Sequence, residues 1–258
     1  MTSRLAPVAA VLGMVVTALS GVAWAVGPIG SAADTHAVAV RVDPPVPARA
    51  LVLGDSAIAA LNWVPAAREA VQGFDATLDL RACRRLYYPS CASPPPPTAY
   101  EALALHGPGF EVLVISVGYN DLAGMTATSF ENVVGRARDL GYRQIVWWTL
   151  RAVDNGFASR NAVIGDELAT GQYPDVVLAD WNHYTADRAQ WFVGDGVHYR
   201  PIGAWAAADY LSRKMAFLDH RPCPAPTSPE LAPQDPCPDP DVTGPVAAIA
   251  SLYPIGGS

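Results

Sequence analysis

Residues 111–118 read EVLVISVG, a continuous apolar run that predicts a β-strand covered on both faces, because a strand with one solvated face alternates apolar and polar residues. Four more short strands are predicted at 50–56, 74–80, 143–150 and 175–181. Stretches with helical spacing lie between and after them, at 57–72, 98–107, 127–139, 157–169 and 202–217. This alternation predicts an α/β fold with a five-stranded parallel sheet and helices on both of its faces.

Local signals refine three of these helices. Pro65 is expected to kink or break the helix predicted at 57–72, because proline lacks the amide hydrogen that an inner helical position needs. Ser129 is a candidate N-cap for the helix at 127–139. Pro201 suits the first position of the last helix, where the amide hydrogen has no intrahelical partner.

Composition narrows the class of protein. The 258-residue chain is 51% hydrophobic and 16% charged, which suits a globular domain with a sizeable core. Its 17 basic and 24 acidic residues give a net charge of −7, which argues against a nucleic-acid partner. One apolar stretch alone approaches membrane length, so a polytopic membrane protein is excluded.

That stretch lies at the N-terminus. Arg4 precedes about 22 apolar residues that end in Ala23-Trp24-Ala25, a pattern typical of a secretory signal cleaved after Ala25. An uncleaved membrane anchor and a buried helix are the alternatives, and the first two agree on an exported or cell-envelope protein. The expected organisation is a signal peptide or membrane anchor, a Pro-containing linker, a folded domain and a Pro-rich tail, at 1–25, 26–47, 48–221 and 222–258.

Four cysteines are present, and none forms a C-x-x-C pair of the kind that binds zinc. In an exported protein an even number of cysteines indicates disulfides. Of the three possible pairings we favour Cys83–Cys91 with Cys223–Cys237, because the members of each pair are close in sequence. Four free thiols are the alternative.

Polar motifs follow three of the predicted strands. They are Gly54-Asp55-Ser56, Gly118-Tyr119-Asn120-Asp121 and Asp195-Gly196-Val197-His198. Each alone is typical of a turn or loop. The carboxyl ends of parallel strands meet at one edge of the sheet, so together they supply a hydroxyl, a carboxamide, an imidazole and a carboxylate.

These groups predict acyl-transfer chemistry. Ser56 needs a base to become a nucleophile, and His198 can accept its proton near neutral pH. Asp195 can orient the imidazole and stabilise its charged form. The Ser56 N–H and the Asn120 side-chain amide are candidate donors to the oxyanion.

The three motifs resemble blocks of the SGNH, or GDSL-type, hydrolase family, over roughly residues 48–219. The resemblance implies a flavodoxin-like three-layer sandwich with strand order 2-1-3-4-5. It also implies ester hydrolysis or acyl transfer on lipids, acetylated sugars or cell-wall glycans, without metal or organic cofactor. The chain lacks the glycine that the family usually places after the second strand. The N–H of Ala82 or Cys83 is the candidate replacement.

Other residues near these motifs are weaker candidates. Arg81, Arg84 and Arg85 could bind an anionic or polar substrate, or could be solvated loop charges. Tyr119 could line an acyl pocket or simply pack. The sequence therefore predicts an exported, monomeric serine esterase. An O-acyltransferase with the same residues and a non-catalytic carbohydrate- or lipid-binding module remain the alternatives.

Overall fold

The computed structural model describes residues 48–71, 75–122 and 124–218. Its sheet consists of β1 (Arg49–Gly54), β2 (Asp75–Leu80), β3 (Val112–Ser116), β4 (Gln144–Trp148) and β5 (Val176–Ala179). All neighbouring strands run parallel, in the order β2-β1-β3-β4-β5. The predicted fold class, the five strands and their order are confirmed.

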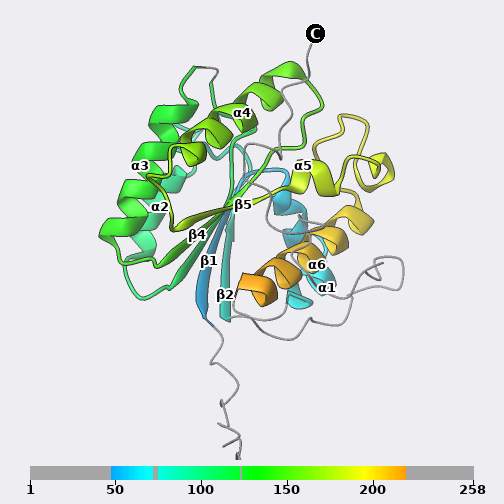
Figure 1. The fold of residues 1–258 in the computed structure, drawn as a ribbon. Coiled ribbons are helices and arrows are strands. Elements are labelled where there is room, and N and C mark those ends of the chain that lie inside the picture. Colours follow the sequence, from blue (N-terminus) through cyan, green and yellow to red (C-terminus); the bar gives the residue numbers. More distant parts are fainter. Residues whose placement is uncertain (1–47, 72–74, 123, 219–258) are drawn as a thin grey trace, which may run out of the picture. The chain divides into compact units, whose positions relative to one another are not determined.

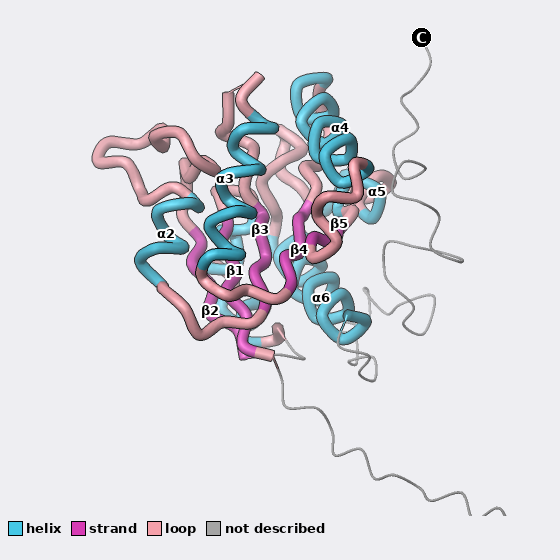
Figure 2. The backbone as a smooth tube through the Cα atoms, turned by 60° about the vertical axis from the view of Figure 1, so that its left-hand side comes forward, coloured by secondary structure: helices cyan, strands magenta, loops and turns pink. Residues whose placement is uncertain are grey.

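Helices cover both faces of the sheet (Figures 1 and 2). The layer on one face contains the 3-10 helix η1 (Ile58–Asn62), α1 (Pro65–Glu69) and α6 (Pro201–Leu218), and the other contains α2 (Ala99–His106), α3 (Thr126–Asp139) and α4 (Asn155–Ala169). The short α5 (Trp181–Tyr184) and η2 (Ala189–Trp191) follow β5. This is the three-layer, flavodoxin-like arrangement.

Alternate residues of β1, β3 and β4 belong to two separate cores. In β1, Val52 packs toward α6 and Leu53 packs toward α2 and α3. In β3, every residue from Val112 to Ser116 is buried. A parallel strand covered by helices on both faces needs apolar side chains on both, which is why the run at 111–118 is uninterrupted.

One predicted helix break is confirmed, and one helix start differs from the prediction. The stretch at 57–72 is divided at Pro65 into η1 and α1, as expected, with Pro65 at the first turn of α1, where its missing amide hydrogen costs nothing. α3 begins at Thr126 with Met125 as N-cap, so Ser129 lies buried inside the helix and does not cap it.

Three strands end level with one another. Gly54 pairs in register with Leu80 of β2 and with Ser116 of β3. The loops after β1, β2 and β3 therefore leave the same edge of the sheet side by side, and this edge positions the site described below.

Some predictions fall outside the described residues. They are the signal peptide or anchor, the linker at 26–47, the Pro-rich tail and the Cys223–Cys237 pair. In the part of the chain that the structure describes, no helix is both long and apolar enough to cross a membrane.

Candidate active site

The first motif forms a tight turn directly after β1. A Cβ on Gly54 would lie 2.2 Å from Ile58 Cγ2 and 2.7 Å from Leu80 Cδ2, so a larger residue here would displace η1 or β2. The chain then passes through Asp55 to Ser56, which is partly exposed. The close packing at Gly54 thus fixes where the Ser56 hydroxyl emerges at the sheet edge.

Asp55 is fully buried and joins this turn to the loop after β3. Its Oδ1 accepts a hydrogen bond from the N–H of Ala57 (3.1 Å), and its Oδ2 accepts from the N–H groups of Gly118 (3.1 Å) and Tyr119 (3.0 Å). Burial raises the pKa of Asp55 to about 6, against the opposing effect of these hydrogen bonds. Asp55 therefore holds the first and second motifs together.

The third motif brings its histidine onto the serine. His198 Nε2 lies 3.0 Å from Ser56 Oγ, although the two residues are 142 positions apart. His198 Nδ1 lies 2.6 Å from Asp195 Oδ2. The hydroxyl, imidazole and carboxylate are thus within hydrogen-bond distance in series, which is the arrangement that activates a serine.

The Asp195 carboxylate also organises its own loop. Its Oδ1 accepts from the backbone N–H groups of Val197 (2.8 Å) and His198 (3.0 Å). Burial acts to raise the pKa of Asp195, but the hydrogen bonds from His198 and from these two amides outweigh it and hold the pKa below its usual value. Asp195 is therefore ionised at neutral pH and faces Nδ1 as an acceptor.

Backbone contacts set the shape of this loop. Phe192 and Tyr199 form an antiparallel bridge, and the Val193 N–H donates to the His198 carbonyl (2.9 Å). Gly196 has φ +72°, in the left-handed region that favours glycine. Asp195 and His198 consequently lie on the same side of one short loop.

Asn120 is held beside the turn that follows β2. The side-chain Nδ2 of Asn120 donates to the Arg84 carbonyl (3.2 Å), and the backbone carbonyl of Asn120 accepts from Arg85 Nε (2.7 Å). Both oxygens of the buried Asp121 accept from the Leu86 N–H, and burial raises the pKa of Asp121 to about 6. The loops after β2 and β3 are thus fastened together at three points.

The turn without glycine is built around a strained cysteine. Cys83 has φ +66° and is, among the described residues, the only non-glycine residue with a positive φ. The Arg84 N–H donates to the Arg81 carbonyl (3.3 Å) to close the turn. Cys83 is joined to Cys91 by a disulfide, as predicted. The covalent link helps to hold a conformation that a side chain disfavours.

Three of the predicted backbone donors near the serine are free. Within the described residues, the N–H groups of Ser56, Ala82 and Cys83 make no hydrogen bond to another protein group. The Arg81 N–H, just before Ala82, donates to the Gly54 carbonyl (3.0 Å), which joins the turn after β2 to the end of β1. The N–H groups of Ser56 and of Ala82 or Cys83, with the Asn120 side-chain amide, therefore remain the candidate oxyanion donors.

The three arginines that are weaker candidates for substrate binding lie in different environments. Arg84 has no exposed surface, and its guanidinium donates to the side chain and carbonyl of Asp79 and to the Pro97 carbonyl. This correction to the prediction has a simple cause: Arg84 neutralises Asp79 inside the protein and has no surface left for substrate. Arg81 also pairs with Asp79 (2.9 Å) but is exposed. Arg85 braces Asn120, as described above.

Tyr119 lies between the sheet edge and α4. Its ring packs edge-on against Phe157, with 5.0 Å between centroids, and its hydroxyl accepts from the Arg151 N–H (2.6 Å). Burial raises the pKa of Tyr119 well above its usual value. Its side chain is engaged by protein groups, which favours the packing alternative.

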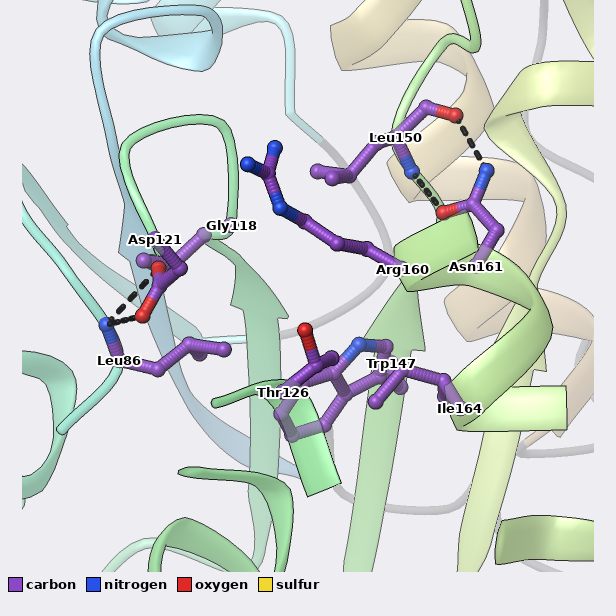
Figure 3. Close-up of a pocket in the computed structure, with 10 residues that line it drawn as sticks. Leu86, Gly118, Asp121, Thr126, Trp147, Leu150, Arg160, Asn161 and Ile164 are labelled. Carbon is purple, nitrogen blue, oxygen red and sulfur yellow. Dashed lines mark hydrogen bonds between the residues drawn. The ribbon is translucent and has the colours of Figure 1, made fainter. Parts of the chain in front are cut away.

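A small cavity lies behind the second motif (Figure 3). Its volume is about 10 Å³, roughly the space of one water molecule. The Arg160 side chain extends along it toward Gly118 and Asp121, and Asn161 pairs with the backbone of Leu150 through two hydrogen bonds. This cavity is too small for an acyl chain. Among the described residues, no cluster of three or more His, Cys, Asp or Glu side chains is arranged to hold a metal ion.

The role of Asp55 goes beyond the serine-containing turn that the sequence predicts. The available signal was a carboxylate placed immediately after a strand buried on both faces, where an acid has to find backbone donors. The contribution of Arg151, taken up below, gave no signal in the sequence, because its partners lie 32 and 45 residues away.

Comparison with known proteins adds little to this site. No protein-family model matches the chain, and no curated protein matches it. A search of solved structures finds the protein titled "Crystal Structure of TesA", at 17% identity and a TM-score of 0.46, covering 66% of this chain and 97% of that one. A likeness this distant supports no inference about function. Any functional proposal therefore depends on the site itself.

Proposed function

We propose that the protein is a serine ester hydrolase of the SGNH type. One observation carries the proposal: Ser56, His198 and Asp195 form an uninterrupted hydrogen-bonded series at the carboxyl edge of a parallel sheet. Open α/β sheets bind their ligands at this edge. The fold alone would not justify the proposal, because many unrelated activities share it.

The protonation states follow from the geometry. An ionised carboxylate only accepts hydrogen bonds, so Asp195 requires the proton of the neutral imidazole to be on Nδ1. The lone pair of His198 is then on Nε2, which faces Ser56 Oγ. The imidazole is therefore in the tautomer that can remove the serine proton.

In the proposed reaction, Ser56 Oγ attacks the ester carbonyl while its proton passes to His198 Nε2. The oxyanion is stabilised by the N–H groups of Ser56 and Ala82 and by the second N–H of the Asn120 amide. His198 then protonates the departing alcohol, which leaves an acyl-enzyme. Water, deprotonated by the same nitrogen, attacks the acyl group and regenerates Ser56. Each oxyanion donor typically contributes about 2.7–4 kcal/mol to lowering the barrier.

We also propose that the protein acts outside the cytoplasm. The charge-free apolar segment after Arg4 and the Cys83–Cys91 disulfide both support export. The proposed substrates are esters of lipids, acetylated glycans or other cell-envelope components.

The test is active-site labelling of the full chain with a fluorophosphonate probe, combined with hydrolysis of p-nitrophenyl esters of graded acyl length. Wild-type protein should be labelled and active, and Ser56→Ala should lose both. Ser159→Ala, which removes an exposed serine on α4, is the matched control and should retain both. An unlabelled wild type would contradict the proposal and favour a binding module. Undiminished labelling of Ser56→Ala would also contradict it, because the reactive nucleophile would then be another residue.

A further inference from the structure

The site residues lie on separate loops, and a ring of contacts joins these loops. Starting from the serine turn, Asp55 Oδ2 accepts from the Tyr119 N–H (3.0 Å). The Tyr119 hydroxyl accepts from the Arg151 N–H (2.6 Å), in the loop after β4. Arg151 Nη1 donates to the Gly196 carbonyl (2.8 Å). Gly196 belongs to the loop whose histidine returns to Ser56, which closes the ring.

Arg151 is the member of this ring that reaches the histidine loop from the sheet. Its guanidinium carbon lies 4.4 Å from the centroid of the Phe192 ring, so the charged group is held on an aromatic face as well as by a hydrogen bond. A Cβ on Gly196 would lie 2.9 Å from Arg151 Nη1 and 2.8 Å from Val153 Cγ1. The arginine is therefore packed closely under the backbone between Asp195 and His198.

The contacts within the histidine loop do not fix its distance from Ser56. The Asp195–His198 hydrogen bond joins two residues of the same loop and would move with it as a unit. What holds that unit against the sheet must come from elsewhere, and Arg151 supplies a direct hydrogen bond from the end of β4. A misplacement of about 1 Å can cost about 10²-fold in rate.

We infer, building on the proposed function, that Arg151 is a positioning residue that sets the distance between His198 and Ser56. It acts through Gly196 and touches neither of the two reacting side chains. Its removal should slow the attack of Ser56 while leaving the Asp195–His198 pair intact.

The experiment compares Arg151→Met, which keeps much of the packing volume, with Arg151→Lys, which keeps the cation over Phe192 and a donor. Arg188→Met is the matched control, since exposed Arg188 lies over Trp191 at 5.7 Å, close along the chain to the same loop. The measurements are kcat and KM for a p-nitrophenyl ester, the fluorophosphonate inactivation rate, and Tm.

Arg151→Met should lower kcat and the inactivation rate together by about 10- to 100-fold. KM should change less than threefold. Arg151→Lys should recover part of the rate, and Arg188→Met should match the wild type.

Two results would overturn the inference: an unchanged inactivation rate in Arg151→Met, or a loss confined to KM. A rate loss in Arg151→Met that Arg151→Lys does not relieve, accompanied by an equal fall in Tm for both, would also overturn it, as a general loss of stability. Failure of the proposed function is distinct, because then the wild type itself would not react with the probe.

Discussion

Asp195→Asn should separate catalysis from folding at this site. Asparagine keeps an oxygen at Oδ1, so it can still accept from the backbone N–H groups of Val197 and His198 (2.8 and 3.0 Å). Its amide nitrogen replaces Oδ2, 2.6 Å from His198 Nδ1, and a donor there favours the tautomer with the proton on Nε2. When His198 Nε2 carries this proton, it can no longer accept the proton of Ser56.

The size of the loss follows from this change of tautomer and from exposure. In a serine protease with a buried carboxylate, the same substitution lowers kcat by about 10⁴-fold. Here the Asp195 and His198 side chains are each 47% exposed, so water can partly substitute for the carboxylate. We therefore expect a fall of about 10³-fold in kcat, equivalent to about 4 kcal/mol in the barrier, with a change in unfolding free energy below ~1 kcal/mol.

The assay is kcat for p-nitrophenyl acetate together with urea unfolding. Asp195→Ala serves as the comparison, because it also removes the side-chain oxygen that accepts from the N–H groups of Val197 and His198, and it should lower the unfolding free energy by ~1–3 kcal/mol. If Asp195→Asn retained kcat within tenfold of the wild type, the assignment of Asp195 as the residue that orients His198 would be wrong.

Three further predictions concern stability, each measured by urea unfolding. Gly203→Ala places a Cβ 2.2 Å from the Trp191 carbonyl and should cost about 1–3 kcal/mol, whereas Gly135→Ala meets nothing within 4 Å and should be neutral or stabilising; equal effects would contradict this. Replacing both Cys83 and Cys91 by alanine should cost about 2.5 kcal/mol for a loop with a separation of 8 residues, and no loss would count against it. The raised pKa of Asp55, about 6 against 3.8, means that its protonated form stabilises the fold below about pH 4 and that this contribution is lost as pH rises through 6. Wild type should accordingly lose about 3 kcal/mol relative to Asp55→Asn between pH 4 and pH 7, and parallel pH curves would refute it.

The sheet could be predicted because a strand that is buried on both faces has a mainly apolar run of residues in the sequence. Runs such as EVLVISVG at 111–118 are mainly apolar on both faces, and five short strands separated by helical stretches leave few topologies. The edge at which the motifs meet followed from the same reasoning, since parallel strands place all their carboxyl ends together.

Contacts between distant residues could not be predicted in the same way. Arg81 and Arg84 look alike in sequence, yet Arg84 is buried on Asp79 because the Pro97 carbonyl, 13 residues away, completes its shell of acceptors. Ser129 looked like a helix cap because the local pattern does not show that α3 starts at Thr126. Only the tertiary packing decides such cases.

If the proposed reaction holds, the solvent exposure of His198 bears on which acceptor receives the acyl group. In the part of the chain that the structure describes, nearly half of the His198 side chain is in contact with solvent. Bulk water can then reach the acyl-enzyme directly. A sugar or other alcohol would have to bind at the same opening and displace that water. Hydrolysis is the default outcome of such a geometry, and efficient transfer would require an acceptor that brings its own binding energy.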